Sequence, residues 1–287
     1  MLDPDAASYL ERLRALGPLP PLEEGTPEQA RAGHEATAAA LSGPGEPVAE
    51  VGDGALGGVP VRTFRPEGAR GTVVYVHGGG WVVGTLATYD PLCRALAVLS
   101  GALVVSVGYD LAPQARHPHQ VGQVAAVLDA VEGPVALAGD SAGAYLATLA
   151  VTLTARPVAG LALVYPVVAP DLARPSASEN ATGYGLTTAT MRWYWQQYLP
   201  ADRPGEPVSL LDADLGTLPP TLVLTAGYDP LRDEGLALAD AIEDTGRPMR
   251  RLSYDGQVHG FFRMTAVMGS ARPAQEQVAG FLREALG

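Results

Sequence analysis

The pentapeptide Gly139-Asp140-Ser141-Ala142-Gly143 restricts the possible folds of this chain more than any other stretch. It follows an apolar run at 135–138 and precedes a stretch of good helix formers at 144–150. A strand, a G-x-S-x-G turn and a helix, in this order, are the context of a nucleophile elbow, where a strained turn presents a serine hydroxyl. The pattern alone is weak, because a Gly-Ser turn also arises by chance. In this context it predicts that Ser141 is a nucleophile.

Segments of strand and helix character alternate along the chain from about Val48 onwards. Continuous apolar runs, which are typical of buried parallel strands, occur at 72–76 and 103–107. Helical patterns at 90–99 and 121–131 follow them. The alternation predicts an α/β protein with a mostly parallel central sheet flanked by helices.

Two regions depart from this alternation. Residues 1–45 contain two amphipathic helices between linkers rich in Pro and Gly, and residues 170–214 are polar and Pro-rich, with one aromatic helix at 191–198. We expect the two regions to fold together over the active site as a helical cap. The catalytic domain is then predicted to comprise residues 46–169 and 215–287.

Composition excludes several classes of function. The net charge of −12 argues against nucleic acid and anionic membranes as partners. All nineteen basic residues are arginine, so lysine-dependent catalysis is excluded and a serine nucleophile requires a histidine. A single cysteine, Cys93, cannot form an internal disulfide. Without a signal-peptide pattern or a membrane-spanning apolar run, we expect a cytoplasmic protein.

Elimination identifies the candidate base and acid. Of the five histidines, only His259 follows Ser141, and in this architecture the triad members occur in the order Ser, acid, His. Asp229 directly follows a buried-type strand at 222–228, at the strand end where catalytic groups gather. Asp229 would otherwise cap the next helix, and Asp233 is the second choice of acid. His259 would otherwise be a surface loop histidine.

A second motif, His77-Gly78-Gly79-Gly80, follows the strand at 72–76. Consecutive glycines allow bare backbone to fold around a ligand atom and to direct N–H groups at it. A phosphate-binding loop is the alternative, but the chain has neither a G-x-G-x-x-G motif nor a Walker lysine. We expect His77 to hold the loop in place. His117 and His119 have no nearby third ligand that would indicate a metal site.

Together these motifs resemble those of the hormone-sensitive-lipase-like carboxylesterases, an α/β-hydrolase family. The resemblance extends over nearly everything after Val48. The motifs that carry it are His77–Trp81, Tyr109–Pro113, Gly139–Gly143, Asp229–Asp233 and His259-Gly260-Phe261. It implies an α/β-hydrolase fold with a helical cap, a triad of Ser141, Asp229 and His259, and an oxyanion hole formed by the N–H groups of Gly79, Gly80 and Ala142. It implies no cofactor and no metal.

The resemblance implies a serine carboxylesterase acting on a small-molecule ester. An amidase or deacetylase with the same triad stays open as an alternative activity. The chain is also compatible with a homodimer. A non-catalytic ligand receptor on this fold is disfavoured, because such receptors have lost the histidine that is retained here as His259. Where the family has the sequence Y-R-L-A-P, this chain has Tyr109–Pro113 with Asp110 in place of the arginine. The change removes a positive charge beside the glycine loop.

Substrate size is predicted from the aromatic residues. Trp193, Tyr194, Trp195 and Tyr198 occur on one short helix of the predicted cap, and the glycine loop adds Trp81 nearby. We expect most of these rings to join the cap to the sheet and one or two to close the pocket at modest depth. The prediction is a preference for short- to medium-chain acyl esters.

Overall fold

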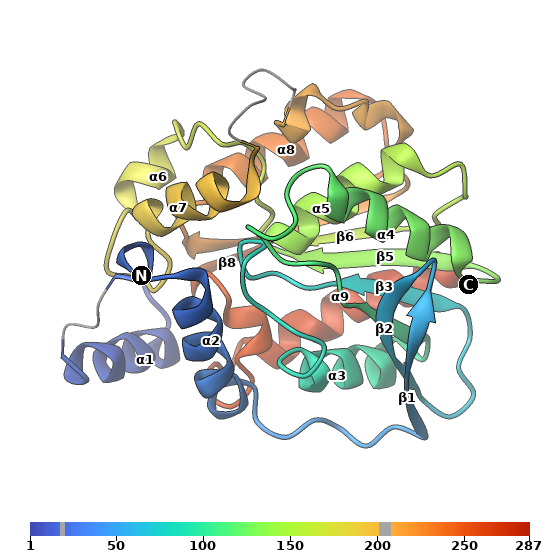
Figure 1. The fold of residues 1–287 in the computed structure, drawn as a ribbon, viewed down its shortest axis with the longest axis horizontal. Helices are drawn as coiled ribbons and strands as arrows, with labels where there is room; N and C mark the ends of the chain where they lie inside the picture. The colour runs from blue at the N-terminus through green and yellow to red at the C-terminus, as the bar shows by residue number, and fades with distance from the viewer. Residues whose placement is uncertain (18–20, 201–207) are drawn as a thin grey trace.

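The structure, a computed structural model, describes residues 1–17, 21–200 and 208–287. Within these residues, eight strands form one sheet (Figure 1). In spatial order the strands are β1 (Glu50–Leu56), β2 (Val59–Arg65), β4 (Leu103–Val107), β3 (Thr72–Val76), β5 (Val135–Asp140), β6 (Leu161–Val164), β7 (Thr221–Tyr228) and β8 (Met249–Val258). Only the pairings of β1 with β2 and of β2 with β4 are antiparallel. The α/β-hydrolase fold predicted from the sequence is therefore confirmed.

The register of the parallel strands brings the predicted site residues together. Val76, the last residue of β3, pairs with Gly139 in β5, so the glycine loop and the serine turn leave the sheet side by side. Tyr228 at the end of β7 pairs with Val258 at the end of β8. The residues that follow these two strands, Asp229 and His259, are consequently neighbours although thirty positions separate them.

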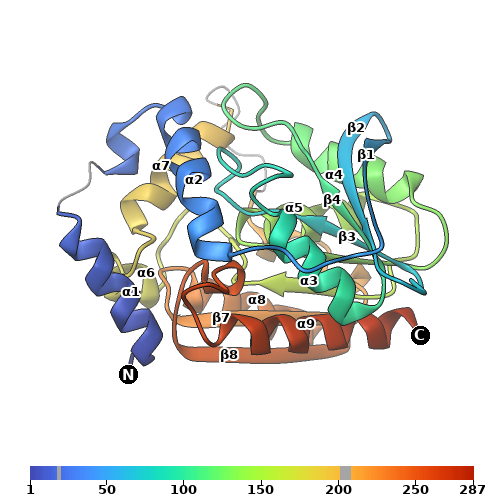
Figure 2. The same ribbon diagram turned by 90° about the horizontal axis from the view of Figure 1, so that it is seen from below.

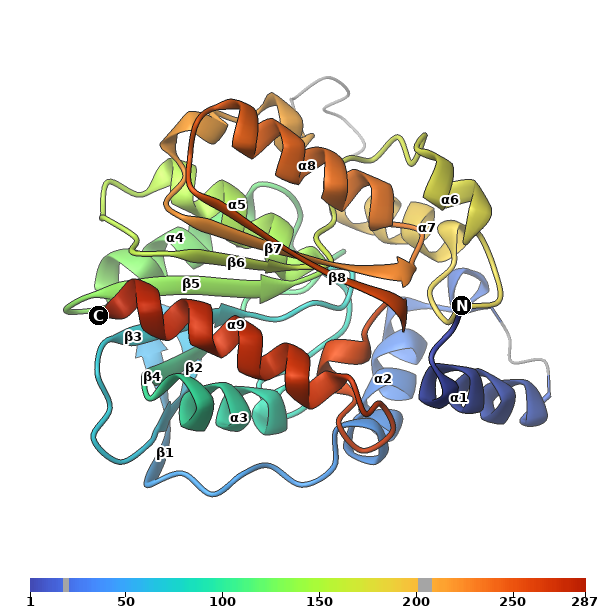
Figure 3. The ribbon, with the colours of Figure 1, turned by 180° about the vertical axis from the view of Figure 1, so that it is seen from behind.

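Helices cover both faces of the sheet, as Figure 3 shows from behind. On one face lie α3 (Asp90–Ser100) and α9 (Ala271–Leu286), and on the other lie α4 (His119–Ala130), α5 (Ala142–Leu153) and α8 (Arg232–Asp244). Each strand from β3 to β7 is thereby buried on both sides, which explains its nearly continuous apolar sequence.

Four further helices lie beyond the carboxyl ends of the central strands (Figure 2). They are α1 (Pro4–Ala15), α2 (Pro27–Ser42), α6 (Pro175–Glu179) and α7 (Thr188–Tyr198). The two helices predicted within residues 1–45 and the aromatic helix predicted at 191–198 are confirmed. A capping box of Thr26 and Gln29 begins α2. Residues 18–20 and 201–207 of the predicted cap lie outside the described residues.

Several element boundaries differ from the sequence patterns: α4 begins at His119 and not at 121, and α7 begins at Thr188 and not at 191. The last helical pattern in the sequence spans 274–286, but α9 begins earlier, at Ala271, because Pro273 lies in its first turn, where a helix tolerates proline. The last strand pattern in the sequence spans 249–254, but β8 extends beyond Tyr254 to Val258, since a register shift between Ala226 and Tyr228 lets the pairing with β7 continue. The polar residues at 255–257 therefore belong to the strand, and His259 follows it directly.

An aromatic cluster joins α7 to the glycine loop. Trp81 is fully buried and stacks on Tyr198 with ring centroids 4.2 Å apart, and Trp195 lies 4.5 Å from the same Trp81 ring. The ring of Tyr145 in α5 meets all three edge-on. As expected, these rings attach α7 to the rest of the protein, and Tyr194 instead lines the cavity beside them.

The single cysteine, Cys93, belongs to the core between α3 and the sheet. Its side chain is fully buried, and burial raises the pKa of its thiol to about 12. Among the described helices, none combines the length and the hydropathy that crossing a membrane requires.

Candidate active site

Ser141 occupies the turn between β5 and α5 in a strained conformation, with φ of 52° and ψ of −120°. Its N–H donates to the carbonyl of Val164, 2.9 Å away. Small neighbours are required, because a Cβ atom on Gly143 would lie 2.0 Å from the Val76 carbonyl oxygen. One on Gly139 would lie 2.6 Å from the Gly143 backbone. The strand–turn–helix context predicted for Ser141 is thus present.

Ser141, His259 and Asp229 lie in one hydrogen-bonded line. The Nε2 atom of His259 is 3.0 Å from the Ser141 Oγ, and its Nδ1 atom is 2.7 Å from the Asp229 Oδ2. The Asp229 side chain is fully buried, and that of His259 is 13% exposed. Because a carboxylate accepts hydrogen bonds, Nδ1 carries the proton and Nε2 is free to accept the hydroxyl proton.

Asp229 also performs the local role that the sequence left open. Its Oδ1 accepts the N–H of Leu231, and its own carbonyl accepts from the Asn180 side chain. Asp233, the second choice of acid, instead accepts from the Ser176 N–H and pairs with Arg232. It joins α6 to α8. The contact of Asn180 with Asp229 was not predicted. Asn180 lies in the middle of a polar stretch of sequence, where no motif distinguishes it from its neighbours.

The glycine loop forms part of the wall next to Ser141. Gly79 and Gly80 have φ of 109° and 56°, and an added Cβ would lie 2.2 Å from the Val83 carbonyl oxygen or from the Tyr194 ring, respectively. Only glycine fits at either position. Within the described part of the chain, no hydrogen-bond partner is found for the N–H groups of Gly79, Gly80 or Ala142.

Asp140 fixes the glycine loop to the serine turn, and sequence reasoning missed it. Its buried carboxylate accepts from the hydroxyls of Tyr75 and Tyr89 and from the N–H of Gly78, at 2.8, 3.0 and 2.9 Å. Burial raises the pKa of this carboxyl, and these donors oppose the rise. The residue before the serine is unspecified in G-x-S-x-G, so the motif itself gave no signal for it.

His77 holds the loop, as the sequence predicted. Its Nδ1 is 2.8 Å from the Gly78 carbonyl oxygen, and its ring stacks on Tyr109 at 4.3 Å. Burial lowers the pKa of His77 to about 4, so the ring is neutral at neutral pH. Asp110 pairs with His119 on the surface, and Arg31 of α2 donates to the Val82 carbonyl beside the loop. A positive charge next to the glycine loop is therefore supplied from α2.

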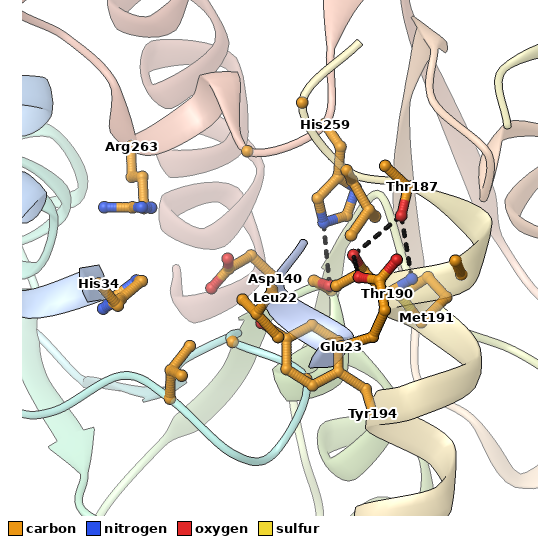
Figure 4. Close-up of a pocket in the computed structure, with 18 of the residues that line it drawn as sticks. Leu22, Glu23, His34, Asp140, Thr187, Thr190, Met191, Tyr194, His259 and Arg263 are labelled. Carbon is orange, nitrogen blue, oxygen red and sulfur yellow. Dashed lines mark hydrogen bonds between the residues drawn. The ribbon is translucent and has the colours of Figure 1, made fainter. Parts of the chain in front are cut away.

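A cavity of about 590 Å³ opens onto Ser141 and His259 (Figure 4). Glu23 and residues of α7, including Thr190 and Tyr194, line it on one side. Arg263 and His34 lie at the opposite side in Figure 4. Sequence reasoning missed these two residues, because neither carried a motif. In the described ranges no group of three or more potential metal ligands is found. His117 and His119 therefore belong to no such group there.

A mostly parallel sheet with a Ser–His–Asp line at the carboxyl ends of its strands defines the class of α/β hydrolases. The family model described as alpha/beta hydrolase fold matches residues 73–263, and the chain belongs to that family. The family includes the hormone-sensitive-lipase-like esterases, so the resemblance noted in the sequence is confirmed.

Relatives with names and solved structures are similar over most of the chain. An ethyl acetate hydrolase of Pseudomonas putida is 33% identical, with 99% of each chain covered. Carboxylesterase NlhH of Mycobacterium tuberculosis is 36% identical over 82% of this chain and 81% of its own. The structure of an ester hydrolase from the metagenome of Lake Arreo superposes with a TM-score of 0.92, at 32% identity and with 99% of each chain covered.

Proposed function

We propose that this protein is a carboxylesterase in which Ser141 is the nucleophile, His259 the general base and Asp229 the residue that orients the imidazole. The observation that carries the proposal is the continuous hydrogen-bonded line from the Ser141 hydroxyl through His259 to the buried Asp229. The names of the relatives favour ester hydrolysis over amide hydrolysis. The retained contact of His259 with Ser141 argues against a non-catalytic receptor.

The mechanism follows from these contacts. His259 takes the proton of Ser141 as Oγ attacks the ester carbonyl, and the resulting oxyanion is bound by the N–H groups of Gly79, Gly80 and Ala142. The C–O bond to the alcohol then breaks, and the alcohol leaves with the proton from His259. Water, deprotonated by His259, attacks the acyl-enzyme, and Ser141 is regenerated as the carboxylic acid leaves.

Residues 1–45 and 170–214 form the cap of this active site in our proposal. Tyr194 of α7 lies against Gly80 and bounds the cavity, which limits the length of chain that can be accommodated. Each methylene that enters the cavity contributes about 0.8 kcal/mol until the cavity is full. We therefore infer a preference for short- to medium-chain acyl groups of about four to eight carbons.

The experiment is a screen of p-nitrophenyl esters of graded acyl length beside matched anilides, with wild type and Ser141→Ala. We expect kcat/KM to peak at medium length, the esters to be the better substrates, and Ser141→Ala to lose nearly all turnover. Circular dichroism of Ser141→Ala should match wild type, since only a hydroxyl is removed. Wild-type-like turnover in Ser141→Ala would refute the triad, and efficiency that rises to palmitoyl esters would refute the size limit.

A further inference from the structure

One end of the cavity is polar and positively charged. Arg263 and His34 both lie against the ring of Tyr89: the guanidinium carbon is 5.9 Å from its centroid, and the imidazole stacks on it at 6.5 Å. In Figure 4 the two side chains lie across the cavity from the residues of α7. Arg263 is four positions after His259, so a short stretch of chain connects this end to the proposed base.

Arg263 has no hydrogen-bond acceptor within the part of the chain that the structure describes. Among the residues that the structure describes, its side chain makes neither an ion pair nor a hydrogen bond, and its Nη1 atom is buried. Arg62 and Arg94, which are also partly buried, both pair with carboxylates. The charge of Arg263 lowers the pKa of the nearby Asp140, but three other donors already bind that carboxylate. A partly buried guanidinium without an acceptor is unfavourable unless a ligand supplies one.

His34 adds a hydrogen-bonding atom to the same end. Within the described ranges neither ring nitrogen has a hydrogen-bond partner; Nδ1 is enclosed by protein, so Nε2 is the nitrogen that a ligand can reach. Burial and the charge of Arg263 lower the pKa of His34 to about 3, so it is neutral at neutral pH and adds a donor without a second charge. On the cap side, the carboxylate of Glu23 accepts from the Thr190 hydroxyl. An anionic group would be repelled there and attracted to Arg263.

We propose that Arg263, together with His34, binds a carboxylate that the ester substrate carries away from its scissile bond. The proposal rests on the esterase function above and names its substrate class. Half-esters of dicarboxylic acids carry such a group on the acyl part, and esters of hydroxy acids carry it on the alcohol part. The net charge of −12 repels anions at long range, but salt screens that repulsion over about 10 Å. The local contact with Arg263 therefore determines whether a carboxylate binds.

Pairs of substrates that differ only in this charge test the proposal. On the acyl side, monoethyl glutarate is compared with ethyl 4-carbamoylbutanoate, its neutral amide analogue. On the alcohol side, 4-acetoxybutanoate is compared with 4-acetoxybutanamide. We expect wild type to have a higher kcat/KM for the carboxylate substrate than for its amide analogue in at least one pair. The pair that shows this preference identifies whether the acyl or the alcohol part of the ester reaches Arg263.

Variants then assign the preference to the residue. Arg263→Gln should lower the ratio of kcat/KM for carboxylate over amide by about 10- to 100-fold, which is the usual effect of losing a hydrogen bond to a charged group. Arg263→Lys should retain part of the ratio, and His34→Phe, which keeps the stacking on Tyr89, should lower it by less. Arg192→Gln removes the same charge from an exposed position on α7 and should leave the ratio unchanged.

The outcomes separate this proposal from the proposed function. Equal losses for both members of a pair in Arg263→Gln would mean that the residue only supports Tyr89 and Asp140, and would overturn the inference. Hydrolysis of the neutral esters by wild type without preference for a carboxylate would also overturn it and leave the esterase intact. If wild type hydrolyses none of the esters, the esterase function fails. Calorimetric binding of monoethyl glutarate to Ser141→Ala, weakened by the additional change Arg263→Gln, tests the contact without turnover.

Discussion

At the scale of single residues, Asp229 shows how one side chain meets two demands. One carboxylate oxygen accepts the N–H of Leu231 and the other accepts from Nδ1 of His259. The backbone contact fixes the rotation of the carboxylate, so the second oxygen can only face the imidazole. Local structure and the proposed chemistry therefore depend on the same rotamer.

This arrangement predicts the effect of Asp229→Asn. The amide oxygen will stay on the Leu231 N–H, so the NH₂ group faces Nδ1 of His259 and forces the proton to Nε2. In that tautomer the imidazole cannot accept the proton of Ser141, and we expect turnover to fall by about three to four orders of magnitude. Asp233→Asn is the matched control, because Asp233 lies outside the line, and kcat should change little. Reversed effects would identify Asp233 as the acid.

At the scale of elements, the sequence predicted those features that depend on local pattern and strand order. Ser141, Asp229 and His259 each follow a recognisable strand, and parallel strands end at one edge, so their meeting could be predicted. The partners of Asp140 could not, because Tyr75 and Tyr89 lie 65 and 51 positions away in the chain. Their pairing depends on the three-dimensional packing of separate elements.

The same limit applies to the N-terminal helices. Their existence was readable from periodicity and from the Thr26 cap, but their contacts were not. Arg31 donates to the carbonyls of Val82 and Ala112, the Leu41 carbonyl accepts from Ala266, and the Gln257 side chain donates to Asp3. These bonds connect the N-terminal segment, residues 1–45, to the glycine loop and to the chain on both sides of His259.

Deleting residues 1–45 should therefore reduce activity more than secondary structure. We expect kcat/KM for short esters to fall by about a hundredfold, since a displacement of about 1 Å at a reacting group can have that effect. Far-UV circular dichroism should lose only the signal of α1 and α2. Arg31→Met should give part of the loss, and Arg12→Met, at an exposed position on α1, none. Unaltered kinetics in the truncated protein would mean that these helices do not support the site.

At the scale of the whole molecule, buried carboxyl groups link stability to pH. Glu234 is buried, and its Oε1 accepts the N–H of Val168 at 2.7 Å. Burial raises the pKa of Glu234 well above its usual range, and the charge of Asp229 adds to the rise. A group with a higher pKa when folded contributes stability that is fully present below its unfolded pKa. That contribution is lost as the pH rises through the folded pKa.

Glu234→Gln should flatten this decline. The amide retains an acceptor for Val168 and cannot ionise. The free energy of unfolding of Glu234→Gln should therefore fall less than that of wild type as the pH rises above about 4.3, the ordinary pKa of glutamate. Urea unfolding at several pH values measures the difference. Glu11→Gln removes a carboxylate from an exposed position on α1 and should follow the wild-type curve. Parallel curves for Glu234→Gln and wild type would contradict the assignment.

The burial of Cys93 has a practical consequence for site-specific labelling. Its thiol is enclosed between α3 and the sheet and keeps its proton at neutral pH. Maleimides should therefore leave the native protein unmodified. The chain also has no lysine, so no side-chain amine competes for the reagent. A cysteine introduced at Arg192 on α7 and another at the exposed Leu153 at the end of α5 would then be the only reactive sites. A dye pair attached there would show whether the distance between α7 and α5 changes during turnover.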